Sequence, residues 1–185
     1  MQDYHEFLDE ILVDAVTLQK RVAELGAQIS LDYQGKDLHL VCILRGGVVF
    51  LTDLMRYITV PHTLDFMAVS SYGTARQSTG QIRITYDLKD EIHDRNVLLV
   101  EDIVDSGYTI TSVLDMLRTR HPRSLRVCTM LDKPERREVV VPIDYCGFVI
   151  PNKFVFGYGL DLDEYYRNLP FIATVNLNKY KPESR

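Results

Sequence analysis

The stretch NVLLVEDIVDSGYT, residues 96–109, decides the fold that we predict for this chain. Its four consecutive apolar residues, Val97 to Val100, are typical of a strand that is buried on both faces of a parallel sheet. Two adjacent carboxylates follow the run, then a third, then a small hydroxyl-rich turn. The next apolar residues recur at the spacing of one helix face: Ile110, Val113, Leu114 and Leu117. The stretch therefore predicts a strand, an acidic edge, a hydroxyl-rich loop and a helix.

This unit offers a site for a phosphorylated sugar. Ligands of open α/β sheets bind beyond the carboxyl ends of the strands, and the unpaired N–H groups at a helix start favour a phosphate. Gly107 lets the backbone approach that phosphate, and Ser106 and Thr109 can donate hydroxyl hydrogen bonds. Glu101 and Asp102 can accept hydrogen bonds from a sugar diol, directly or through a bound Mg²⁺. The predicted ligand is a group such as ribose 5-phosphate.

Residues 100–109 closely resemble, without a gap, the phosphoribosyl-diphosphate-binding signature of the type I phosphoribosyltransferases. The resemblance implies that the ribose and its 5-phosphate are held by Glu101, Asp102, Asp105, Ser106, Gly107, Tyr108 and Thr109. Acidic residues at strand ends also occur in receiver domains and GTPases, so the carboxylates alone are not specific. The chain lacks the glycine-rich motifs of P-loop and dinucleotide-binding proteins, which argues against those two classes.

Composition indicates an ordinary globular protein. The chain has 185 residues, which is most simply one domain, and 46% of them are hydrophobic. A net charge of −5 argues against nucleic acid as the main partner. The three cysteines are widely spaced, as expected of buried thiols in a reducing compartment. No apolar run approaches membrane-spanning length, so we expect a soluble, cytoplasmic protein without a membrane partner.

The remaining patterns predict an α/β chain. We expect strands at residues 11–13, 38–44, 64–69, 82–86, 125–131, 145–150 and 154–160, and helices at about 14–35 and 48–57. Alternation of strands and helices from 38 to 131 predicts a central parallel sheet with helices on both faces. The resemblance implies one phosphoribosyltransferase domain, 1–185, with a core at about 15–138 and a hood subdomain made of 1–14 and 139–185.

Two other loops carry candidate ligand contacts. Arg45 and two glycines follow the strand at 38–44, and such a cationic turn can face an anion. The resemblance implies that Arg45 and Gly46 hold the pyrophosphate together with Arg167, and that a non-proline cis peptide bond lies at this turn. Ser71 and Tyr72 begin a long polar loop, residues 70–80, which the resemblance identifies as a flexible catalytic lid that excludes water.

The carboxyl-terminal third indicates the branch of the family. Residues 132–134 and 150–167 resemble the hypoxanthine-guanine phosphoribosyltransferases. The resemblance implies that Lys133 donates to the 6-oxo group of a purine, that Phe154 stacks on the base and that Val155 supplies backbone groups to the base edge. It also places Asp161 at the base site and, with Glu101 and Asp102, among the ligands of Mg²⁺.

The implied reaction is the Mg²⁺-dependent transfer of a 5-phosphoribosyl group from phosphoribosyl diphosphate to N9 of hypoxanthine or guanine, with release of pyrophosphate. Asp105 is our candidate for the catalytic base. The alternatives are a xanthine-preferring enzyme, a transferase for orotate, uracil or adenine, a regulatory RNA-binding relative, and a receiver-type binding module. We expect a homodimer or homotetramer that acts on small molecules.

Overall fold

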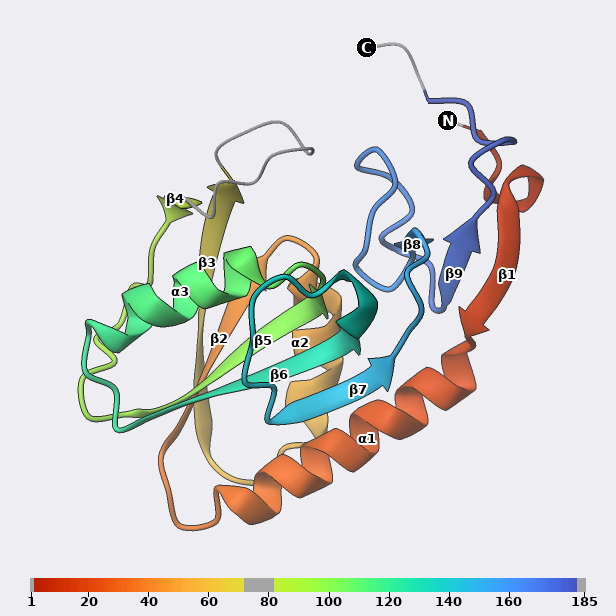
Figure 1. Ribbon diagram of the computed structural model, residues 1–185. Coiled ribbons are helices and arrows are strands. Elements are labelled where there is room, and N and C mark those ends of the chain that lie inside the picture. The colour runs from red at the N-terminus through yellow and green to blue at the C-terminus, as the bar shows by residue number, and fades with distance from the viewer. Residues whose placement is uncertain (1, 72–81, 183–185) are drawn as a thin grey trace.

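Within residues 2–71 and 82–182, which the computed structural model describes, six strands form a central sheet of order β4-β3-β2-β5-β6-β7 (Figure 1). The strands are β2 (Leu38–Leu44), β3 (His62–Ser71), β4 (Ile82–Tyr86), β5 (Asn96–Val104), β6 (Ser124–Asp132) and β7 (Tyr145–Val149). Neighbouring strands are parallel except β4, which returns antiparallel to β3. This arrangement confirms the predicted α/β class and the predicted return strand.

Helices cover both faces of this sheet (Figure 1). Helices α1 (Ala15–Asp32) and α2 (Gly47–Tyr57) pack on one face, and α3 (Tyr108–Arg118) packs on the other. Side chains alternate along each strand, so Leu98 and Val100 of β5 belong to the core under α1 and α2. Val97 and Leu99 belong to the core under α3. The uninterrupted apolar run of β5 is therefore explained by a strand with a packed core on each side.

The sequence of α1 explains where this helix begins and how closely it packs against α2. The Asp14 carboxylate accepts hydrogen bonds from the backbone N–H groups of Val16 and Thr17 at 2.9 and 3.0 Å, which is an N-cap. Gly26 lies where α1 passes the end of α2, since a Cβ there would be 2.4 Å from Cβ of Tyr57. Gly26 is therefore required by a close helix crossing, and it does not interrupt the helix.

The order of the strands places a switch point between β2 and β5. From β2 the chain proceeds through β3 to β4 on one side, and from β5 through β6 to β7 on the other. The loops that follow β2 and β5 therefore diverge and leave a crevice at the carboxyl edge. Strand β5 is longer than predicted, because it stays paired with β6 as far as Val104, whereas its pairing with β2 ends at Val100. Glu101 and Asp102 thus lie within the projecting end of a strand.

A second sheet, of order β1-β9-β8, lies beside the carboxyl ends of β5, β6 and β7 (Figure 1). Its strands are β1 (Leu8–Val13), β8 (Val155–Phe156) and β9 (Ile172–Val175). Two short 3-10 helices, η1 (Tyr4–Glu6) and η2 (Pro134–Arg136), complete the described elements. Phe7, Phe156 and Tyr166 form an aromatic cluster beneath this sheet, with ring centroids 5.3 to 5.9 Å apart. Segments from both ends of the chain build this unit, as the resemblance implied.

Two predicted boundaries in the carboxyl-terminal third differ from the structure. Strand β7 pairs with β6 in the central sheet, so the sheet does not end near residue 138. The expected strand 154–160 is shortened to Val155–Phe156. Gly157, Tyr158 and Gly159 all have positive φ, at 93°, 50° and 95°, and a strand cannot continue through such residues.

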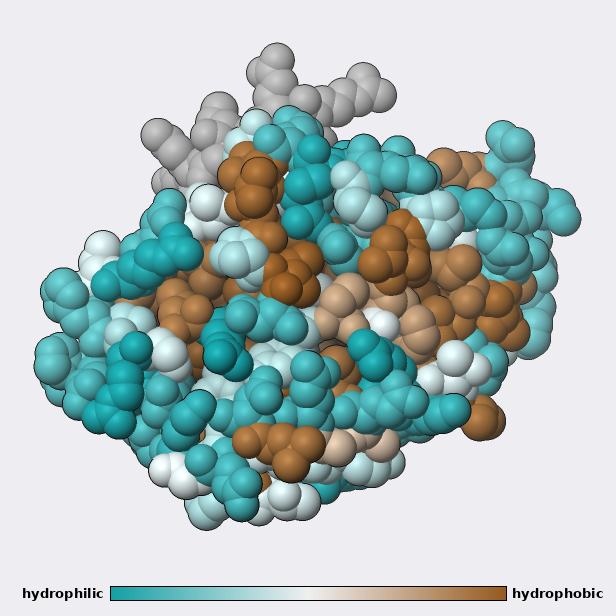
Figure 2. Space-filling model, turned by 60° about the horizontal axis from the view of Figure 1, so that its bottom comes forward, coloured by the Kyte–Doolittle hydropathy of each residue, from teal (hydrophilic) through white to brown (hydrophobic). Residues whose placement is uncertain are grey.

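The surface is mainly polar, with separate apolar patches on the face shown in Figure 2. No helix among the described residues has the length and apolar character needed to span a membrane.

Candidate active site

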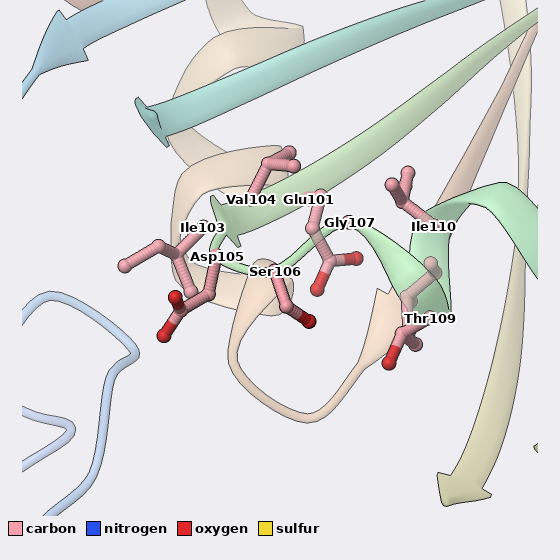
Figure 3. Close-up of a pocket in the computed structure, with 9 residues that line it drawn as sticks. Glu101, Ile103, Val104, Asp105, Ser106, Gly107, Thr109 and Ile110 are labelled. Carbon is pink, nitrogen blue, oxygen red and sulfur yellow. The ribbon is translucent and has the colours of Figure 1, made fainter. Parts of the chain in front are cut away.

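The loop between β5 and α3 borders a cavity of about 140 Å³. The side chains of Glu101, Asp105, Ser106 and Thr109 contribute its polar lining. Figure 3 shows the side chains of Glu101, Ser106 and Thr109 around this loop, with the Asp105 carboxylate pointing away from that of Glu101. The backbone N–H groups at the start of α3 lie next to this cavity, so the site combines an acidic wall with a helix amino terminus.

Gly107 is required by the fold itself. Its φ is 94°, and a Cβ at this position would be 2.6 Å from the carbonyl oxygen of Val139. It would also be 3.0 Å from Cδ of Arg137. The turn therefore needs glycine because of its left-handed conformation and because a neighbouring segment packs against it, while the approach of a ligand stays a prediction.

Glu101 and Asp102 are half-buried residues whose carboxylates form an adjacent pair. Burial raises the pKa of Glu101 well above its usual value, and the adjacent charge of Asp102 raises it further. Burial also raises the pKa of Asp102, against the hydrogen bonds that it accepts from Glu101 and from the N–H of Ile103. Oε2 of Glu101 is shielded from solvent and lacks a hydrogen-bond partner among the described residues. The positive charge of Arg167 lowers the pKa of Asp102 but does not outweigh its burial.

The cationic turn after β2 lies directly against this pair. A Cβ on Gly46 would be 1.6 Å from Oδ2 of Asp102, so only glycine fits there while that carboxylate keeps its position. The peptide bond between Leu44 and Arg45 is cis, as the resemblance implied. From the hood, Gly159 approaches the same turn, since a Cβ on it would be 2.1 Å from the carbonyl oxygen of Gly46. Three segments that are distant in sequence thus meet around one turn.

The two arginines predicted to hold pyrophosphate are joined through Glu164. Nη2 of Arg45 lies 2.6 Å from Oε1 of Glu164, and Nη2 of Arg167 lies 3.2 Å from its Oε2. Arg167 also contacts Asp161 at 2.8 Å and donates a 2.8 Å hydrogen bond to the carbonyl oxygen of Gly159. Arg45 and Arg167 therefore lie close together, and each guanidinium group is paired with a carboxylate.

On the other side of the acidic loop, Lys133 lies close to Asp105. Lys133 is only 6% exposed, and its Nζ is 3.9 Å from Oδ2 of Asp105. Burial lowers the pKa of this lysine, and the Asp105 carboxylate opposes that shift. Phe154 is 50% exposed, so its ring is available to a ligand. Val155 of β8 is buried and pairs with Thr174 of β9, and β8 is the edge strand of the small sheet in the described residues.

The three carboxylates predicted to bind Mg²⁺ do not form a ready-made metal site. Asp161 is paired with Arg167, and among the described residues no group of three or more His, Cys, Asp or Glu side chains could hold an ion. The unpartnered Oε2 of Glu101 nevertheless fits a hydrated Mg²⁺. This ion is commonly bound by one or two carboxylates and completed by water and substrate phosphates. The residues fit an ion that arrives with other oxygen ligands.

The predicted lid cannot be placed in the same way. Tyr72 lies outside the described residues, and Ser71 is described only as the last backbone position of β3. The lid remains a prediction.

Sequence reasoning assigned no role to three charged residues that the structure brings to the site. Nε of Arg136 lies 3.1 Å from Oδ1 of Asp105. Arg137 donates to backbone carbonyls of the acidic loop, and Glu164 joins the two arginines described above. The available signals were the pair of arginines shortly after Lys133, which also suits a solvated turn, and the position of Glu164 within the stretch 150–167.

Known proteins with the same architecture are similar to this chain along most of its length. Residues 10–163 match the model of the phosphoribosyl transferase domain family. The chain is 50% identical over 180 residues to the hypoxanthine-guanine phosphoribosyltransferase of Mycobacterium avium, covering 94% of this chain and 89% of that protein. It is 46% identical over 170 residues to the hypoxanthine phosphoribosyltransferase of Salmonella typhimurium, covering 91% and 96% of the two chains.

Solved structures agree with the sequence relatives. The crystal structure of a hypoxanthine phosphoribosyltransferase from Staphylococcus aureus superimposes with a TM-score of 0.93 at 43% identity, covering 97% of each chain. Such similarity in sequence and fold confirms the resemblance and the predicted fold. The chain belongs to the phosphoribosyltransferase family and, within it, to the hypoxanthine(-guanine) phosphoribosyltransferases of purine salvage.

Proposed function

We propose that the protein transfers the 5-phosphoribosyl group of phosphoribosyl diphosphate to N9 of hypoxanthine or guanine, with Mg²⁺ and with release of pyrophosphate. The observation that carries this proposal is the approach of Lys133 to Asp105 at 3.9 Å. Lys133 can donate a hydrogen bond to the 6-oxo group of a purine, and Asp105 is the first residue of the ribosyl-phosphate loop, so the contact places the two predicted subsites next to each other. A base and a ribose held on either side of this pair would be close enough to react.

The acidic edge and the loop would hold the sugar. Glu101 and Asp102 supply acceptors for the 2- and 3-hydroxyls, and the loop from Ser106 to Thr109 supplies donors for the 5-phosphate. Glu101 and Asp102 would hold Mg²⁺ together with oxygen atoms of the substrate and water, and the ion would supply positive charge that offsets the charge of the diphosphate. The buried and unpartnered oxygen of Glu101 supports this assignment.

Arg45 and Arg167 would bind the diphosphate leaving group. Their guanidinium groups already converge on Glu164, a carboxylate that occupies the position we assign to an anion. Planar guanidinium groups bind phosphate oxygens in pairs, which suits a group that gains charge as the glycosidic bond breaks.

Asp105 would accept a proton from the purine. Its carboxylate is next to the Lys133 ammonium and the Arg136 guanidinium, so it can face the imidazole side of a base whose 6-oxo group contacts Lys133. Phe154, half exposed on the hood, would stack on the base, and the backbone at Val155 would contact its edge.

A parallel assay tests the proposal. The protein is incubated with phosphoribosyl diphosphate, Mg²⁺ and, separately, hypoxanthine, guanine, xanthine, adenine or orotate, and nucleotide formation is followed by absorbance. We expect turnover with hypoxanthine or guanine. Turnover with xanthine alone, or with adenine or orotate alone, would show that our assignment of the base site is wrong. Absence of turnover with every base would refute the transferase assignment, and RNA binding would then be measured.

A further inference from the structure

Arg137 donates hydrogen bonds to backbone carbonyl groups at the start of the loop between β5 and α3. Its Nε donates to the carbonyl oxygen of Asp105 at 3.0 Å, and its Nη2 donates to that of Val104 at 3.3 Å. Nη2 also makes a short contact with the carboxylate of Asp132 at the end of β6. The guanidinium group is largely buried in these contacts, and its orientation is fixed on three sides.

The residues after Arg137 continue the same support. The N–H groups of Glu138 and Val139 both donate to the carbonyl oxygen of Ser106, at 2.9 and 3.1 Å. Three successive carbonyl groups, those of residues 104 to 106, therefore accept hydrogen bonds from residues 137–139. A loop can direct its N–H groups toward a phosphate only if its carbonyl groups turn away and find donors elsewhere.

The same segment carries the lysine of the base site. The backbone N–H of Lys133 donates to the carbonyl oxygen of Val104 at 3.0 Å, the oxygen that Arg137 also contacts. Arg137 thus binds the loop to which we assign the sugar phosphate. It also lies four residues from Lys133, in a turn whose Arg137 side chain contacts Asp132.

We propose that Arg137 is a positioning residue, which holds the loop from Asp105 to Thr109 in its phosphate-accepting conformation and fixes that loop relative to Lys133. The inference rests on the proposed function for its kinetic consequence. Arg137 itself does not touch substrate in this account. Replacement should weaken the binding of the ribosyl phosphate more than the binding of the base.

Arg21 provides a matched control. It is also partly buried, and its guanidinium donates to two backbone carbonyls, those of Gly147 at 3.0 Å and Cys146 at 2.7 Å. These carbonyls belong to the edge strand β7, not to a loop of the site. Arg21→Gln therefore removes comparable contacts, and any general loss of stability should be similar in kind.

The experiment compares Arg137→Gln and Arg21→Gln with the unaltered protein. The readouts are the melting temperature, the KM for phosphoribosyl diphosphate, the KM for hypoxanthine, and the affinity for ribose 5-phosphate measured by calorimetry. We expect Arg137→Gln to raise the KM for phosphoribosyl diphosphate and the Kd for ribose 5-phosphate by about tenfold, since contacts of charged donors are lost. The KM for hypoxanthine should change by less than about threefold.

Equal changes in ligand affinity in Arg137→Gln and Arg21→Gln would overturn the proposal, as would an unchanged Kd for ribose 5-phosphate. If Arg137→Gln does not fold, Arg137→Lys replaces it. That variant keeps a charge for Asp132, yet a single ammonium lacks the fork that reaches both carbonyls. A wild-type affinity in Arg137→Lys would then contradict us. Binding is measured apart from turnover. If the unaltered protein binds ribose 5-phosphate but has no activity, the proposed reaction is refuted, and the effect of Arg137→Gln on the Kd for ribose 5-phosphate still tests this inference.

Discussion

Glu101→Gln should make the protein more stable and less active. In the folded state burial and the charge of Asp102 raise the pKa of Glu101 above its ordinary value of 4.5. An acid of this kind binds more protons in the folded state than in the unfolded state between its two pKa values. The free energy of unfolding therefore decreases as the pH rises through that window, and the penalty is complete above the folded-state pKa. Glutamine cannot ionise and removes this penalty.

The size of the effect follows from the contacts of the side chain. Among the described residues one carboxylate oxygen of Glu101 is buried without a hydrogen-bond partner, and the nearby charge that raises its pKa is that of a second carboxylate, Asp102. A glutamine amide can donate the hydrogen bond that links the two side chains, and it leaves a neutral oxygen in the position of Oε2. Relief of an unsatisfied buried group is worth about 1–3 kcal/mol. In a chain of this size that corresponds to a rise in Tm of about 2 to 12 °C.

Thermal unfolding of Glu101→Gln and of the unaltered protein between pH 5 and pH 9 tests this expectation. Glu91→Gln is the control, because it removes one negative charge from an exposed position. The difference in Tm between Glu101→Gln and the unaltered protein should grow as the pH rises, while Glu91→Gln should show no such growth. A lower Tm for Glu101→Gln at pH 8, or a constant difference across the range, would refute the reasoning.

Other changes to the site should alter turnover or affinity. Asp105→Asn should reduce kcat by about 10²- to 10⁴-fold in a steady-state assay, because the purine proton loses its acceptor. Glu164→Gln should lower the KM for phosphoribosyl diphosphate by up to about fivefold, since an exposed ion pair that competes for Arg45 is worth little. Gly46→Ala has an allowed φ of −61° but forces the Asp102 carboxylate to move, and kcat/KM should decrease about a hundredfold.

Each of these expectations can fail in a distinct way. Asp115→Asn, which changes an exposed carboxylate of α3, is the control for Asp105→Asn, and unchanged turnover in the latter would remove the assigned base. An increased KM in Glu164→Gln would mean that Glu164 supports the arginines instead of competing with substrate. Wild-type kinetics in Gly46→Ala would show that the two loops separate at no cost.

The acidic strand and its loop could be predicted because the information is local. An uninterrupted apolar run, two carboxylates and a hydroxyl-rich turn occupy residues 97–109, and the alternation of strands and helices determines the parallel sheet. The clustering of the loops after β2 and β5 then follows from the switch point in strand order.

What the sequence did not disclose depends on contacts between distant segments. Tyr145–Val149 has the pattern of a strand, but nothing local tells which sheet it joins. Gly107 was explained by a ligand, whereas its Cβ position is opposed by Val139, more than 30 residues away in the chain. Arg137 and Glu164 lie among other charged residues, where a solvated side chain is the common case, and only the fold identifies their partners.

The central claim is that the ribosyl-phosphate loop and the base site around Lys133 together form one bond, from C1 of the ribose to N9 of the purine. The most direct measurement is the stoichiometry of the reaction of the unaltered protein with hypoxanthine, phosphoribosyl diphosphate and Mg²⁺, with products identified by nuclear magnetic resonance and mass spectrometry. We predict one equivalent each of the N9-linked nucleotide and of pyrophosphate for every hypoxanthine consumed. Release of ribose 5-phosphate and pyrophosphate without nucleotide, or no consumption of hypoxanthine, would contradict the account.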